Sequence, residues 1–187
     1  YSNAASVLRK SGEDLRRLKE AGLSILYFGL ESGDDRTLER IHKGATADEV
    51  VEAVSRANEF GFKTSVMGLL GIAGRERWRQ HAEATARAAS RMNPRFFSLL
   101  TATPVEGTRF FDEVEAGTIT LPRPDETLEE LQVILEGLDC RNTVFRCNHA
   151  SNYLPLGGRL PNDKERLTEA VRAARRGDTA LRPEWLR

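Results

Sequence analysis

Three short apolar runs alternate with segments of helical periodicity along the first two thirds of the chain. The runs cover residues 24–30, 63–70 and 95–101 and are rich in β-branched, aromatic and large aliphatic residues, a composition that predicts buried β-strands. Amphipathic segments separate them. Strands that alternate with helices form successive βαβ units, so the sequence predicts an α/β fold with a parallel sheet and right-handed crossovers.

The helical segments carry recognisable start and stop signals. Ser11 and Asp34 stand where N-cap residues are favoured, and Thr46 with Glu49 has the spacing of a capping box. Glycines close three of these helices. The expected helices of this part lie within residues 11–22, 35–43, 46–61 and 75–92.

The strand and helix rhythm changes after residue 117. Residues 125–138 and 162–176 have helical patterns, and the stretch between them, 140–158, has no legible strand and is predicted to be irregular. We therefore expect two parts. Residues 1–120 form the parallel α/β unit, and residues 121–187 form a mostly helical C-terminal extension that packs on the sheet or reaches across it.

The balanced composition excludes several classes of protein. The 187 residues suit one domain, the 40% hydrophobic content can build a core, and 28 basic residues balance 28 acidic ones. This balance disfavours nucleic acid and anionic membrane surfaces as partners. No apolar run approaches the roughly 20 residues of a membrane span, and no secretory leader is visible, so we expect a cytoplasmic protein. Because the chain opens with Tyr1 in mid-pattern, we expect it to be cut from something longer.

Motifs for common chemistries are missing from the sequence. It contains no G-x-S-x-G elbow and no glycine-rich phosphate loop, and the three histidines lie too far apart in sequence to suggest a zinc site. Cys140 and Cys147 could not hold an iron–sulfur cluster without further ligands. We interpret them as reduced, packed thiols, with a disulfide as the less expected alternative in the cytosol.

Two clusters of polar residues are candidates for chemistry. Glu31 and Ser32 follow the first predicted strand directly, and ligands of parallel α/β folds bind at the carboxyl ends of strands. The alternative is that Glu31 only bonds a neighbouring loop. Residues 146–153 form the second cluster, which is dense in hydrogen-bonding side chains and is either a functional segment or a loop pinned by its own side chains.

Three blocks of sequence resemble a known family. The blocks GLESGDDRTLERIHKG, SVMGLLGIAG and LLTATPVEGTRFF are similar to the second half of the barrel of radical S-adenosylmethionine (SAM) enzymes, in the group that includes the oxygen-independent coproporphyrinogen oxidases. The first matches a G-[LIV]-[EQ]-S motif at the end of the fourth barrel strand. The second matches a G-L-P-G turn, with Ile72 and Ala73 in place of Leu-Pro. The third matches P-x-x-G-T at Pro104, Gly107 and Thr108.

The resemblance implies a fold and a set of cofactor contacts. The fold would be the C-terminal half of a partial (β/α)6 barrel. By position, Glu31 would accept hydrogen bonds from the ribose of SAM, with Ser32 beside it. Leu69 would contact adenine, and the backbone of Thr101 would read the adenine edge.

The resemblance also exposes departures from the family pattern. The C-x-x-x-C-x-x-C loop that ligates the [4Fe–4S] cluster is missing, as is the glycine-rich stretch of the second strand, and both would lie upstream of Tyr1. Met67 stands where some relatives have a second carboxylate. The family generates a 5′-deoxyadenosyl radical for oxidoreductase-type or transferase-type reactions. We expect this chain to be inactive without its missing N-terminal half, and its substrate is unknown.

Two hypotheses remain at this point. The chain is either a fragment of a radical SAM enzyme or a degenerate α/β module that binds a nucleotide or a partner without redox chemistry. Under the first hypothesis, residues 146–153 would cross the mouth of the barrel. His149 and Asn152 would then face the cavity above Glu31 and contact substrate.

Overall fold

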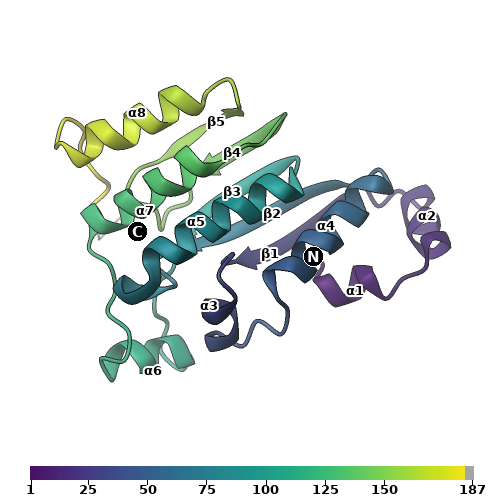
Figure 1. Cartoon of the computed structure of the whole chain (residues 1–187), viewed down its shortest axis with the longest axis horizontal. Coiled ribbons are helices and arrows are strands. Elements are labelled where there is room, and N and C mark those ends of the chain that lie inside the picture. The colour runs from purple at the N-terminus through teal and green to yellow at the C-terminus, as the bar shows by residue number, and fades with distance from the viewer. Residues whose placement is uncertain (184–187) are drawn as a thin grey trace.

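The computed structural model describes residues 1–183, and its strands form a single mixed sheet (Figure 1). The strand order follows the chain, with β1 to β4 parallel and β5 antiparallel to β4. The three expected strands and their parallel pairing are confirmed. The strands are β1 (Ile25–Glu31), β2 (Lys63–Leu70), β3 (Phe96–Thr101), β4 (Thr143–Cys147) and β5 (Leu156–Leu160).

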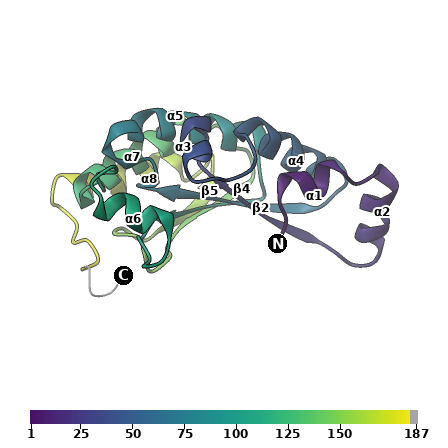
Figure 2. The same ribbon diagram turned by 90° about the horizontal axis from the view of Figure 1, so that it is seen from below.

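Helices lie against one face of this sheet. Figure 2 shows α4, α5, α7 and α8 on the same side of the strands, so the described part has the layers of an open half barrel. The helices are α1 (Ala4–Leu8), α2 (Gly12–Glu20), α3 (Asp35–Arg40), α4 (Ala47–Glu59), α5 (Gly74–Met92), α6 (Arg109–Glu115), α7 (Pro124–Gly137) and α8 (Lys164–Arg175).

Alternate residues of the strands face two different environments. Phe28, Val66 and Phe97 point into the helix layer and are at most 2% exposed, forming the centre of the hydrophobic core. Their strand neighbours point the other way, and Tyr27 is 47% exposed. We call this second surface the open face. Its members on the first three strands are Tyr27, Gly29, Glu31, Ser65, Met67, Leu69, Phe96, Ser98 and Leu100.

The predicted helix caps are present. Ser11 and Thr46 each accept a hydrogen bond from the backbone N–H three residues on, and Asp14 and Glu49 bond back to them, so both are complete capping boxes. Asp34 caps α3 through its side chain. These caps satisfy N–H groups that the first helical turn leaves without partners, which explains why the local sequence located the helix starts.

The prediction that residues 140–158 are irregular is wrong. β4 pairs in parallel with β3 through Val144 opposite Phe96, and β5 pairs with β4. The error has a physical reason: β4 has only five residues, and β5 contains Gly157 and Gly158, which have weak strand preference by themselves. Their extended conformation is stabilised by the ladder that β3 begins, so the extension contributes two strands to the sheet.

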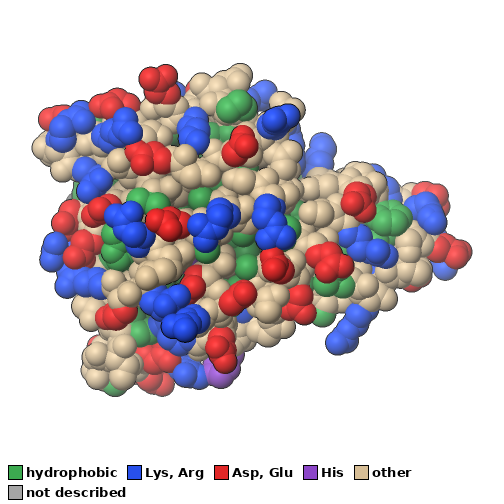
Figure 3. Space-filling view, in the orientation of Figure 1, with side chains coloured by type: hydrophobic (Ala, Val, Ile, Leu, Met, Phe, Trp, Pro, Cys, Tyr) green, Lys and Arg blue, Asp and Glu red, His purple; other side chains and the backbone are tan. Residues whose placement is uncertain are grey.

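Charge is evenly distributed over the helix-covered side. Figure 3 shows basic and acidic side chains interspersed there rather than gathered into a patch of one sign. This face offers no basic surface of the kind that nucleic acids require. Among the described helices, none combines the length and apolar character needed to cross a membrane.

The free edge of β1 already carries the start of another pairing. Ser2 forms a parallel bridge with Phe28, and its N–H donates to the carbonyl of Tyr27 at 2.8 Å. The first residues of the chain therefore lie where the next parallel strand of the sheet would run.

Candidate cofactor site at the carboxyl ends of the strands

Glu31 ends β1 in an unusual backbone conformation. Its φ is 61°, and the β1–β2 register shifts between Gly29 and Glu31, as in a β-bulge. The carboxylate lies on the open face, is 21% exposed and accepts a hydrogen bond from Lys43 Nζ at 3.1 Å. A left-handed conformation costs a residue with a Cβ about 1–2 kcal/mol. Such local strain is typical of functional positions, where it aims a side chain.

Gly29 makes room for this carboxylate. A Cβ at Gly29 would lie 2.0 Å from Oε1 of Glu31 and 2.9 Å from Nζ of Lys43. Because both atoms are at the ends of flexible side chains, a methyl group would displace them rather than the backbone. The glycine therefore lets the Glu31–Lys43 ion pair fold back over β1.

Ser32 and Gly33 fix the turn against α5. The Ser32 hydroxyl is fully buried, lies 2.7 Å from Nδ1 of His81 and accepts a hydrogen bond from the N–H of Asp34 at 2.9 Å. A Cβ at Gly33 would lie 2.3 Å from backbone atoms of Ala84, so only glycine fits there. Ser32 was expected to lie beside the cofactor, but its hydroxyl points into the helix layer and has no surface open to a ligand.

The contact between Ser32 and His81 continues to a buried carboxylate. Nε2 of His81 lies 3.1 Å from Oε1 of Glu130, and the carboxylate of Glu130 accepts the N–H of Gly71 at 3.0 and 3.2 Å. The Nε2 approach is not aligned for a hydrogen bond and is an electrostatic contact. Ser32, His81 and Glu130 are 0% exposed, and we call them the buried polar chain.

The contacts of His81 are compatible with a neutral ring that is protonated on Nε2. Because the Ser32 oxygen already accepts the N–H of Asp34, its own hydrogen is free to donate to Nδ1 of His81. The proton of a neutral ring then belongs on Nε2, which faces Glu130. The buried polar chain thus links the turn after β1 to the turn after β2 through α5 and α7. Sequence reasoning missed His81 and Glu130, although each places a polar side chain on the apolar face of its helix.

Asp34 joins the same turn to α5 from the surface. It accepts two hydrogen bonds from Arg77, at 2.7 and 3.0 Å, and caps Thr37 through the backbone N–H and the hydroxyl. Burial raises the pKa of Asp34, but the hydrogen bonds from Arg77 and Thr37 outweigh burial and lower that pKa from 3.8 to about 2. The carboxylate is therefore charged throughout the physiological range.

The other predicted contact residues lie close to this end of the sheet. Leu69 is half-buried on the open face of β2, and Thr101 ends β3 beside it. The Thr101 hydroxyl donates to Oδ1 of Asn152 at 3.0 Å, and its backbone N–H donates to the hydroxyl of Ser151 at 3.1 Å. Asn152 is 1% exposed and also donates to the carbonyl of Leu99. The amide of Asn152 is thus bound within the protein.

His149 has a different environment from Asn152. Its ring is exposed and lines a cavity of about 410 Å³ on the open face, together with Tyr27, Met67 and Arg146. Its Nδ1 accepts the backbone N–H of Ser151 at 3.2 Å and contacts the Ser151 hydroxyl at 2.9 Å. Residues 149–152 are accordingly a loop pinned by its own side chains that also presents one ring to the open face.

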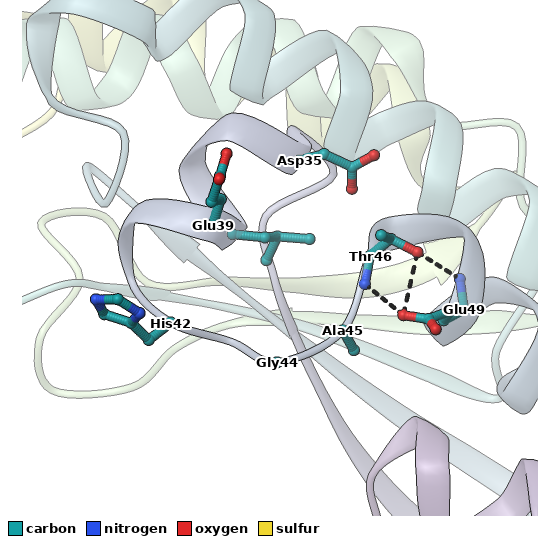
Figure 4. Close-up of a pocket in the computed structure, with 8 residues that line it drawn as sticks. Asp35, Glu39, His42, Gly44, Ala45, Thr46 and Glu49 are labelled. Atoms are coloured by element: carbon teal, nitrogen blue, oxygen red, sulfur yellow. Dashed lines mark hydrogen bonds between the residues drawn. The ribbon is translucent and has the colours of Figure 1, made fainter.

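A second cavity lies away from the strand ends. Figure 4 shows this pocket of about 420 Å³, formed by the turn after α3 and the start of α4. Thr46 and Glu49 satisfy each other in the capping box, and Asp35 accepts the N–H of Ala47. Since capping uses its main polar groups, this pocket is a weaker candidate site than the open face.

The described residues do not fit an iron–sulfur cluster. No group of three or more His, Cys, Asp or Glu side chains among residues 1–183 could hold a metal ion. Cys140 and Cys147 are free and buried, and burial raises the pKa of their thiols to about 11 and about 12, which disfavours the thiolate that metals bind. The adenosyl side of SAM is a different case, because Glu31 and Leu69 present a carboxylate and an apolar side chain on one face.

The fold and the site define a mostly parallel α/β half barrel with a strained carboxylate at its strand ends. Residues 3–86 match the family model described as the radical SAM superfamily. This stretch of the chain is therefore similar to the radical SAM superfamily, whose members use SAM and a [4Fe–4S] cluster in radical-generating enzymes. This match favours the enzyme hypothesis over the degenerate binding module.

Two curated proteins share sequence with this chain, and a solved structure shares its fold. The chain is 33% identical over 106 residues to an uncharacterized methyltransferase of Pyrococcus horikoshii, covering 57% of the chain and 23% of that protein. It is 26% identical over 130 residues to the heme chaperone HemW of Bacillus subtilis, covering 69% of the chain and 34% of HemW. The fold resembles the Elp3 of Methanocaldococcus infernus, with a TM-score of 0.68, 13% identity and coverage of 96% of this chain and 42% of Elp3. The chain thus spans about a third or less of the two curated relatives.

Proposed function

We propose that this chain forms the part of a radical SAM enzyme that binds the adenosyl side of the cofactor and one wall of the substrate cavity. The observation that carries the proposal is the carboxylate of Glu31, held by a left-handed residue at the end of β1 on the open face. An ionised carboxylate accepts strong hydrogen bonds from vicinal hydroxyls such as those of ribose. Leu69, on the next strand, offers apolar surface to adenine.

The residues of the chain orient the cofactor rather than react with it. When bound at a reduced cluster, SAM would supply the radical chemistry that removes hydrogen from a substrate. The buried polar chain holds the turns after β1 and β2 in fixed relation, and the loop at residues 149–152 closes the end of β3. These contacts would keep Glu31, Leu69 and the backbone of Thr101 in one arrangement and limit the access of water. His149 and Asn152 are proposed to contact substrate, with Asn152 acting only if its internal hydrogen bonds open.

We propose that the cluster ligands belong to a C-x-x-x-C-x-x-C segment that completes the barrel along the β1 edge. Ser2 already forms a parallel bridge on that edge. The chain on its own should therefore show no stoichiometric [4Fe–4S] absorption after reconstitution with iron and sulfide. A four-iron cluster bound through Cys140 and Cys147 would contradict this part of the proposal.

The adenosyl part is tested with 5′-deoxyadenosine, which carries both the ribose diol and adenine. Titrating the ¹⁵N-labelled chain should give saturable NMR shifts around Glu31, Leu69 and Thr101. Glu31→Gln should weaken binding about 10- to 100-fold, because a charged acceptor contributes about 1.5–3 kcal/mol. Glu52→Gln, an exposed change on α4, is the matched control and should bind normally. Unchanged affinity of the Glu31 variant would refute the assignment.

A further inference from the structure

The open-face cavity combines cationic and hydrogen-bonding side chains with an apolar floor. It is lined by Tyr27, Met67 and Leu100 from the first three strands and by Arg146, Asn148 and His149 from β4 and the residues after it. Its volume of about 410 Å³ falls in the range of small-molecule sites. Its lining contains no aspartate or glutamate.

Arg146 is presented to this cavity without a charged partner. It stands on β4 opposite Ser98 of β3 and Gly157 of β5. A Cβ at Gly157 would lie 3.1 Å from Nη1 of Arg146, so the glycine leaves space for the guanidinium group beside it. The side chain donates to the carbonyl of Phe145 at 3.3 Å, and no carboxylate of residues 1–183 forms an ion pair with it. Most N–H donors of the guanidinium group therefore remain available.

His149 adds a second donor to the same cavity. Because its Nδ1 accepts the backbone N–H of Ser151, the proton of the neutral ring belongs on Nε2. The ring is exposed, so this N–H can reach a ligand. Arg146 and His149 thus offer hydrogen-bond donors from one region, and nothing in the cavity lining offers a competing negative charge.

We infer that the open-face cavity is a subsite for the carboxylate group of a substrate that has an apolar body. The planar fork of Arg146 matches a carboxylate in two parallel hydrogen bonds, and His149 can supply a third. Tyr27, Met67 and Leu100 would contact the apolar body. This inference rests on the proposed function, since it assigns the substrate class of the same barrel interior.

The test uses benzoate as a probe, because it joins a carboxylate to an apolar ring. Titrating the ¹⁵N-labelled chain with benzoate should give saturable shifts at Ser98, Asn148 and His149, with millimolar affinity. Benzamide has the same shape without the charge and should bind at least about tenfold more weakly. Inorganic phosphate serves as a second probe and should also bind more weakly, because it cannot use the apolar floor.

Variants identify the residue responsible. Arg146→Gln should weaken benzoate binding at least about tenfold, whereas Arg141→Gln, an exposed arginine just before β4 and outside the cavity, should leave it unchanged. Unfolding curves establish that both variants remain folded. The carboxylate assignment would be overturned if Arg146→Gln bound benzoate normally. It would also be overturned if benzamide or phosphate bound the parent protein as tightly as benzoate. The 5′-deoxyadenosine titration of the same sample reports on the proposed function separately, so either idea can fail alone.

Discussion

The buried polar chain gives the sharpest test of how this fold is held together. His81→Ala would leave the carboxylate of Glu130 fully buried with one backbone donor, from Gly71, and would leave Ser32 without its acceptor. Leaving a buried polar group without its partner costs about 1–3 kcal/mol. For a domain of this size that corresponds to a fall in melting temperature of roughly 2–12 °C.

A double-mutant cycle separates the charge from simple loss of packing. Glu130→Gln retains an acceptor for the N–H of Gly71 but removes the buried charge, so we expect it to cost about 1–2 kcal/mol. With the charge removed, His81→Ala should cost less than in the parent protein. The two changes should therefore couple by at least about 1 kcal/mol.

The assay is urea unfolding followed by circular dichroism on the parent, both single variants and the double variant. Glu129→Gln, which changes the neighbouring and partly exposed carboxylate of α7, is the matched control and should stay within about 0.5 kcal/mol of the parent. Strictly additive losses, or a loss below about 1 kcal/mol for His81→Ala, would refute the idea that the His81 ring stabilises the Glu130 carboxylate.

Three further predictions concern other parts of the site. Gly29→Ala should weaken 5′-deoxyadenosine binding about tenfold while leaving the unfolding free energy nearly unchanged, because the added methyl group displaces the Glu31 carboxylate rather than the backbone; a collapse of stability with intact binding would contradict this. Folding lowers the pKa of Asp34 to about 2, so the ionised carboxylate should stabilise the folded chain by about 2 kcal/mol. This stabilisation should be complete above the unfolded pKa of 3.8 and disappear as pH falls through 2. The acid unfolding curve of Asp34→Asn should lack this pH-dependent loss of stability. Cys140 and Cys147 should resist iodoacetamide at pH 8 until urea unfolds the chain, because burial raises the pKa of both thiols; rapid labelling of the native protein, measured by mass spectrometry, would show that one is accessible.

Local signals in the sequence predicted the elements that local interactions stabilise. The apolar runs predicted β1 to β3. Capping chemistry located the helix starts at Ser11, Asp34 and Thr46, because each cap bonds a residue only three positions further on. The short strands β4 and β5 depend on a ladder supplied by a strand more than 40 residues earlier. No pattern within five residues contains that information.

The candidate site was predictable in position but not in the direction of its side chains. The sequence placed Glu31 and Ser32 together at a strand end, which the structure shows, yet the two side chains serve opposite faces. Their separation depends on the left-handed backbone of Glu31 and on the approach of Gly33 to α5. Both are tertiary features. The partners His81 and Glu130 lie 49 and 98 positions beyond Ser32 and only become neighbours in the folded chain.

In the turn after β1, Ser32 stabilises the fold and the adjacent Glu31 is proposed to bind the cofactor, so the two roles depend on each other. Holding Glu31 at φ 61° costs about 1–2 kcal/mol of folding free energy. This backbone conformation turns the carboxylate onto the open face. Ser32, directly after it, makes two hydrogen bonds, one buried and one partly buried, of about 0.5–1.5 kcal/mol each, which is enough to offset that strain. Loosening Ser32 should therefore let Glu31 relax. On this reasoning Ser32→Ala weakens 5′-deoxyadenosine binding without touching the ligand, and Thr85→Val, which removes a neighbouring hydroxyl bonded to the N–H of Gly33, does so as well.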